Sequence, residues 1–159
     1  MWKSLKRFFP KSEAALLLSL LFFFSACSMN QLLQPEFTIT SPVYKSHEED
    51  SSCVSGGVYF NFYNKSGSAV VFMEIKMNVF DKRTGKMAFI GTGTIKSEYN
   101  IRIASGETKK LCVSLDPYIT VRTEEGYYID QFYISRVIYS DGHEWNDILG
   151  VYAVSGGGQ

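Results

Sequence analysis

The amino-acid sequence predicts an all-β protein, an antiparallel β-sandwich of about seven or eight short strands. Residues after position 35 are rich in tyrosine and β-branched side chains and poor in leucine, a composition typical of strands. Apolar and polar residues alternate with a period of two in several runs. Clusters of Gly, Asp, Asn and Ser separate these runs at regular intervals, as turns between antiparallel strands do.

The first 26 residues have the pattern of a secretory leader. Four basic residues among residues 1–11 precede an apolar run over 14–24 that only Ser19 interrupts. This run is much shorter than the ~20 residues that a helix needs to cross a bilayer. We therefore expect residues 1–26 to form a helical signal peptide that is removed; a retained membrane helix is the alternative.

The leader ends in Phe24-Ser25-Ala26-Cys27, which resembles a bacterial lipoprotein signal. The usual form is an aliphatic residue and two small residues before Cys; Phe24 departs from the commoner Leu, as looser, spirochaete-type signals do. The resemblance covers about the first 27 residues. It implies a diacylglyceryl thioether on Cys27, cleavage before it and acylation of its amine, and two or more acyl chains anchor a protein stably. The alternative is that Cys27 is an ordinary residue near a plain cleavage site or in a membrane helix.

The charge of the chain argues against nucleic acid as a partner. The leader contains four basic residues and one acid, so the remainder has a small excess of acidic residues and no basic stripe. The length beyond the leader suits one domain with its own core. We place this domain at residues 36–149, after a tether at 27–35 and before a flexible C-terminal tail at 150–159.

Cys53 and Cys112 are the other two cysteines. An exported chain meets oxidising conditions, so this pair suggests a disulfide. In the strand expected at 108–115 the apolar face is Leu111, Val113 and Leu115, and Cys112 therefore points outward. A bridge would be a surface staple between the start of the domain and a later strand; two separate free thiols are the alternative.

The early strands are expected at 36–40, from Gly57 to the Asn-Lys-Ser turn, and at 71–80. Strict alternation in the last two gives each an apolar face. The first apolar face contains Val58, Phe60 and Phe62, and the second contains Val71, Met73, Ile75, Met77 and Val79.

Residues 87–90 and 94–103 are expected to form one or two further strands, and later strands are expected at 108–115, 127–139 and 144–148. In 127–139, Phe132 and Ile134 fit one face but Val137 and Tyr139 fit the other. A β-bulge at Ser135-Arg136 would bring all four onto one face. The Asp-Gly pair that follows is a strong hairpin signal.

The succession of turns and strands resembles the small Ig-like modules found on many bacterial lipoproteins. It comprises an Asn-Lys-Ser turn, a long strand, Asp-Lys-x-x-Gly-Lys, Ser-Gly-Glu-Thr and Val-Ile-Tyr-Ser-Asp-Gly-His-Glu-Trp. The resemblance spans about residues 36–148 and implies an antiparallel Ig-like β-sandwich. Such modules vary widely in role, so it implies a fold and little more.

The sequence contains no catalytic pattern, and we expect no enzyme, no metal site and no cofactor. Gly91-Thr92-Gly93 lacks the third Gly and the helix of a phosphate loop. The polar loop from Lys45 to Ser52, with His47, and the hairpin with Asp141, His143, Glu144 and Asp147 could bind a cation weakly, but solvated turns explain both.

The outward aromatic residues Tyr59, Tyr63 and Phe72, with Phe80, are a candidate partner surface, because Tyr offers a large contact area at low entropic cost. They could equally cover strand backbones.

The resulting hypothesis is a lipid-anchored envelope protein acting as a non-catalytic binding or structural module. Its partners would be the membrane, through Cys27, and other envelope proteins, at the outer membrane or the periplasmic face of the inner membrane. The alternative is a small-ligand or glycan-binding domain.

Overall fold

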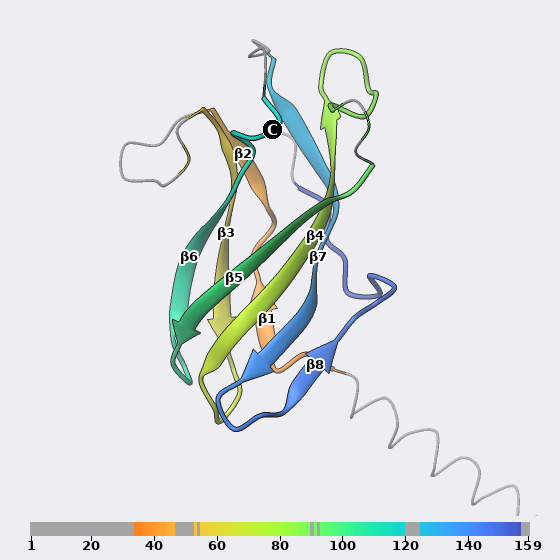
Figure 1. Ribbon diagram of the computed structural model, residues 1–159. Coiled ribbons are helices and arrows are strands. Elements are labelled where there is room, and N and C mark those ends of the chain that lie inside the picture. The colour runs from red at the N-terminus through yellow and green to blue at the C-terminus, as the bar shows by residue number, and fades with distance from the viewer. Residues whose placement is uncertain are drawn as a thin grey trace, which may run out of the picture. The chain divides into compact units, whose positions relative to one another are not determined.

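The computed structural model describes residues 34–46, 53, 55–89, 91, 93–119 and 125–156. These residues form eight antiparallel strands in two packed sheets (Figure 1). The prediction of an all-β sandwich of seven or eight strands is confirmed at this level. The leader, Cys27 and most of the tether lie outside the described residues, as does His47.

The first sheet is built around β3, which spans Gly57–Asn64. On one side it pairs with β6, and on the other it pairs with two short strands in succession, β1 near its end and β2 near its start. The break between β1 and β2 contains Pro42, which lacks the N–H that an unbroken ladder would need. The bounds are Phe37–Ile39 for β1, Val43–Lys45 for β2 and Thr108–Ser114 for β6.

The second sheet has the order β5-β4-β7-β8. Its two central strands are the longest, and a short hairpin with Gly142 at φ 90° joins β7 to β8. The bounds are Val70–Asp81 for β4, Ile95–Ile103 for β5, Tyr127–Tyr139 for β7 and Glu144–Asn146 for β8.

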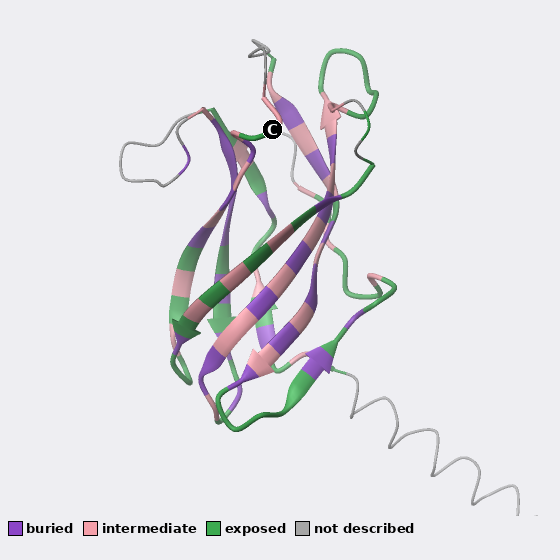
Figure 2. Ribbon diagram, in the orientation of Figure 1, coloured by how far each residue is buried: buried purple, intermediate pink, exposed green. Residues whose placement is uncertain are grey.

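The core lies between the sheets and is filled by alternate residues of each strand, visible as bands of buried residues in Figure 2. Aromatic rings join the layers: Phe60 of β3 packs edge-on against Phe132 of β7 with centroids 4.8 Å apart. Phe62 stacks on Phe37 at 5.0 Å, and Trp145 meets Phe37 edge-on at 4.9 Å. The predicted inner faces of β3 and β6 are confirmed.

The predicted bulge in β7 is also confirmed. Glu74 pairs with Arg136 but the next residue, Ile75, pairs with Ile134, which leaves Ser135 as the extra residue. Since this shift restores the alternation, Phe132, Ile134, Val137 and Tyr139 are all buried.

Several details of the prediction are wrong. Val70, not Val71, lies in the core at the start of β4, because the register shifts between Val70 and Phe72. Of the one or two strands expected across 87–103, the structure has β5, whereas Met87 forms a single bridge to Phe80. Strand β2 was missed. The segment 150–156 is not a free tail: Val154 exchanges two backbone hydrogen bonds with Phe132, and Gly156 donates to Ile129.

Candidate functional site

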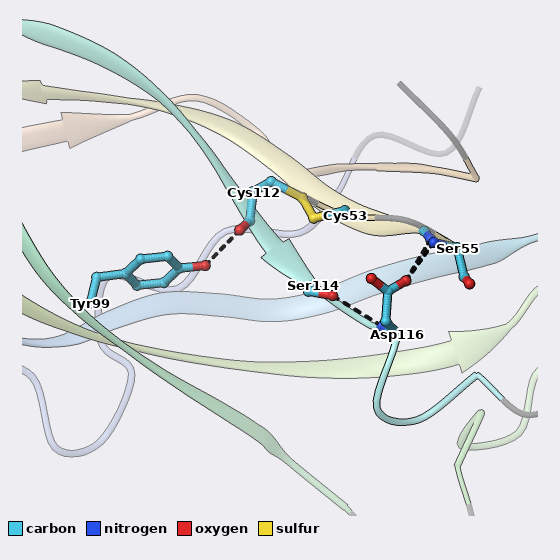
Figure 3. Close-up of a disulfide and its surroundings, with 7 residues drawn as sticks. Cys53, Ser55, Tyr99, Cys112, Ser114 and Asp116 are labelled. Atoms are coloured by element: carbon cyan, nitrogen blue, oxygen red, sulfur yellow. Dashed lines mark hydrogen bonds between the residues drawn. A yellow bond between two sulfur atoms is a disulfide. The ribbon is translucent and has the colours of Figure 1, made fainter. Parts of the chain in front are cut away.

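The structure joins Cys53 to Cys112 by a disulfide that links the chain before β3 to the outer side of β6 (Figure 3). The two residues are 59 positions apart in the sequence. Cys112 is half-buried on the face opposite Leu111 and Val113, whereas Cys53 is fully buried. The bridge therefore ties the beginning of the first sheet to its edge strand.

Gly57 makes the bridge possible. A Cβ atom added at Gly57 would lie 2.6 Å from the sulfur of Cys53 and closer still to that of Cys112. Its φ angle is not positive, so the need for Gly is one of space and not of backbone conformation. Sequence reasoning missed this role because a Gly at the start of a strand also suits a turn.

Hydrogen bonds on both sides of the bridge hold it in place. The Asp116 carboxylate accepts from the backbone N–H of Ser55 at 2.6 Å and of Gly56 at 3.2 Å. The Tyr99 hydroxyl donates to the Cys112 carbonyl at 2.7 Å and so connects the second sheet to the first. Burial raises the pKa of Tyr99, so the hydroxyl keeps its proton.

The predicted partner surface of Tyr59, Tyr63 and Phe72 is not one surface. Tyr59 and Tyr63 lie on the outer face of the first sheet, while Phe72 belongs to β4 in the second sheet. Tyr59 is only 5% exposed, with the Lys45 and Lys110 ammonium groups each 5.4 Å from its ring centre. Tyr63 is 39% exposed, and Phe72 is half-buried beside Arg136. The alternation fixed the face of each strand but not the sheet to which it belongs.

The outer face of the second sheet contains an ionic cluster around Glu74. Its carboxylate accepts from Lys96 at 2.8 Å and from the Ser135 hydroxyl at 2.6 Å, with Lys76 at 3.4 Å. Burial alone would raise the pKa of Glu74, but the hydrogen bonds from Lys96, Ser135 and Lys76 outweigh it and lower the pKa to about 2. The carboxylate is thus held ionised and is not poised to transfer protons.

The polar residues of the β7–β8 hairpin bind one another and the backbone. Glu144 pairs with Arg136 through two hydrogen bonds, and Asp147 is buried and accepts backbone N–H groups. Asp141 and His143 are in contact at 2.5 Å, and hydrogen bonds from Ser68 and from the His143 backbone lower the pKa of Asp141 to about 2. In the part of the chain that the structure describes, no group of three or more His, Cys, Asp or Glu side chains could hold a metal ion.

A second feature that the sequence reasoning missed is the segment after β8. The side chains of Ile148, Leu149 and Val151 are the most exposed large hydrophobic side chains of the described residues. The signal in the sequence is an uncharged run that begins directly after Asp147. Most of this run lies in the tail predicted at 150–159.

Among the residues that the structure describes, no helix has the length and hydropathy needed to span a bilayer. No protein-family model matches the chain, and no curated protein matches its sequence. Its function is therefore inferred from its own residues.

Proposed function

We propose that this chain is a lipid-anchored protein of the bacterial cell envelope, held to a membrane through Cys27. In this proposal the β-sandwich is a non-catalytic binding or structural module that contacts other envelope proteins. The observation that carries the proposal is the Cys53–Cys112 disulfide, because such bridges persist in oxidising compartments outside the cytoplasm. A leader of the kind found in residues 1–26 delivers a chain to that compartment.

The sequence of β3 is adapted to the bridge, which strengthens this support. Any side chain at Gly57 would collide with both sulfur atoms. The bridge in this position therefore requires Gly at residue 57.

The strand order supports the Ig-like assignment implied by the turn pattern. Strands β1, β2, β3 and β6 face strands β5, β4, β7 and β8. As in Ig-type sandwiches, consecutive strands β3 and β4 cross from one sheet to the other, and the last hairpin returns beside β4.

The alternative of a glycan-binding module has less support. A stacking platform needs aromatic rings on one face, and the three predicted residues are divided between two faces. A catalytic role also has little support, since Glu74, Asp141 and Glu144 all have lowered pKa values and are held in ion pairs or turns.

The intact mass of the protein purified from its native membrane tests the proposal. We expect a chain that begins at Cys27 and has the added mass of the diacylglyceryl and acyl groups. The Cys27→Ala variant should lack this added mass and remain unprocessed. A wild-type protein without added lipid, or with its leader retained, would show that the anchor assignment is wrong.

A further inference from the structure

An exposed apolar loop projects from the edge of the second sheet. It comprises residues 148–152, between β8 and the Val154–Phe132 bridge, and we refer to it as the apolar loop. Ile148 is 78% exposed, Leu149 87% and Val151 74%. Single exposed aliphatic side chains are common, but three among four successive residues form a patch of the kind that contacts a partner or a membrane.

The loop is held in its exposed position by hydrogen bonds. The buried carboxylate of Asp147 accepts from the backbone N–H of Val151 and of Tyr152, both at 2.9 Å. The Asp147 N–H donates to the Ser135 carbonyl at 2.9 Å, and the Ala153 N–H donates to the Gly150 carbonyl at 3.1 Å. These bonds fix the backbone at both ends of the loop, in a conformation that leaves the aliphatic side chains exposed.

The loop lies close to the point where the tether enters the domain. The Trp145 indole packs against Phe37 of β1 at 4.9 Å and against Tyr152 of the loop at 5.9 Å. His143 Nε2 lies 3.5 Å from the carboxylate of Glu36. Figure 1 shows the first described residues passing beside the β7–β8 hairpin. From Cys27 to Glu36, a fully extended chain would span no more than about 30 Å.

We propose that the apolar loop inserts into the interfacial region of the bilayer that holds the Cys27 lipid. This inference rests on the proposed lipid anchor, which keeps the loop within reach of that bilayer. No charged residue follows Asp147 in the sequence, and Tyr152 at the base of the loop is a residue type enriched at membrane interfaces. Three protruding side chains are too few for a stable interface between two copies, which buries about 1,200 Å² or more.

A fluorescent label at the tip of the loop tests the proposal. Leu149→Cys in the full-length protein is labelled with nitrobenzoxadiazole and reconstituted into phosphatidylethanolamine–phosphatidylglycerol vesicles. Lys82→Cys is the matched control, because Lys82 is exposed and belongs to the connection between β4 and β5. Figure 1 shows this connection at the end of the sandwich away from β1. We expect the label at 149 to be about threefold brighter and blue-shifted relative to the control, and to be quenched by nitroxide groups on the lipid chains.

Other environments of the loop would give different results, and each of them would contradict the proposed insertion into the bilayer. Shielding that rises with protein density without nitroxide quenching would indicate a second copy. Shielding in native membranes but not in pure lipid vesicles would indicate a partner protein. Equal, water-like emission at both labels would mean that the loop stays in solvent.

The intact mass of the same samples separates this inference from the proposed function. If the mass shows acyl chains but the label at 149 has water-like emission, the anchor proposal stands and the insertion proposal is wrong. A quenched label on a protein without acyl chains would support insertion while removing the anchor.

Discussion

The two ends of β3 are held by different chemistry. At its start, Gly57 lies against a disulfide that connects the chain to β6, a single covalent bond with a few hydrogen bonds around it. At its end, Asn64 is fully buried and is held only by hydrogen bonds. The first end depends on the redox conditions of its compartment and on the absence of a side chain, whereas the second depends on the exclusion of water.

The Asn64 side chain joins two turns of the sandwich. Its Nδ2 lies within hydrogen-bond distance of the carbonyls of Ser68, Ile103 and Ala104, at 2.9, 3.1 and 3.1 Å. Its Oδ1 accepts from the backbone N–H and the hydroxyl of Ser66 at 3.0 and 2.7 Å. Every donor and acceptor of the amide is used, which is what allows a polar group to be buried without a large cost.

Removing the bridge should have the largest effect. We expect the Cys53→Ala/Cys112→Ala variant to lose about 4 kcal/mol of unfolding free energy, because the closed loop of 59 residues no longer restricts the unfolded chain. Urea denaturation of the purified protein measures this loss. Wild-type protein unfolded in dithiothreitol should show a similar loss. A variant as stable as the oxidised wild type would show that the disulfide does not stabilise the start of β3.

Removing the side-chain amide of Asn64 should have a slightly smaller effect. We expect Asn64→Ala to cost about 3 kcal/mol, because buried carbonyl oxygens lose their donor and a cavity remains. Asn61→Ala is the matched control: Asn61 lies on the same strand but is exposed, and its loss should change stability by less than about 0.5 kcal/mol. Equal stability of the two variants would show that the amide does not hold this end of β3.

A methyl group added at Gly57 should destabilise the start of β3 without removing the disulfide that holds it. We expect Gly57→Ala to cost about 2 kcal/mol, because the sulfur atoms or the β3–β6 pairing must shift to admit the added Cβ. Gly67→Ala is the control, since an added Cβ there meets no atom within 4 Å. Thermal unfolding and a free-thiol assay distinguish the outcomes; an intact bridge at wild-type stability would contradict the steric requirement.

Low pH should have the smallest effect. It should destabilise the turns around Asn64 at the end of β3 and leave the disulfide at its start unaffected. Asp141 accepts a hydrogen bond from the Ser68 hydroxyl, and its pKa is lowered from 3.8 to about 2. A group with a lowered pKa in the folded state stabilises that state above the unfolded pKa, and this stabilisation is lost as the pH falls from about 4 to about 2.

Amide hydrogen exchange at Ser68 and His143, followed through this pH range, measures the loosening. Protection is the observed exchange rate relative to the intrinsic rate of an unfolded amide at the same pH, and Asp141→Asn should abolish the pH dependence of this protection. A transition near the ordinary value of 3.8 would mean that the hydrogen bonds do not favour the ionised carboxylate.

Predictions from the sequence were accurate where one strand sufficed. The inner faces of β3 and β6 followed from alternation, and the Ser135 bulge followed from a break in it. The register shift at Val71 could not be found in this way, because the flanking residues are apolar on both faces and pairing with β5 and β7 decides which one is buried. Strand β2 was missed because three residues are too few to show a period.

The sequence by itself determined the all-β class, the turns and most of the inward-facing residues, and it predicts a leader that ends before Cys27. Only the tertiary structure decided that Tyr59 and Phe72 belong to opposite faces, that Gly57 lies against the disulfide, and that Asn64 joins two turns. It also decided that residues 148–152 project into solvent. The physical reason is that propensity and periodicity act over a few neighbouring residues. The assignment of a strand to a sheet, the close approach of a backbone to a disulfide and the exposure of a loop depend on residues that are distant in the chain.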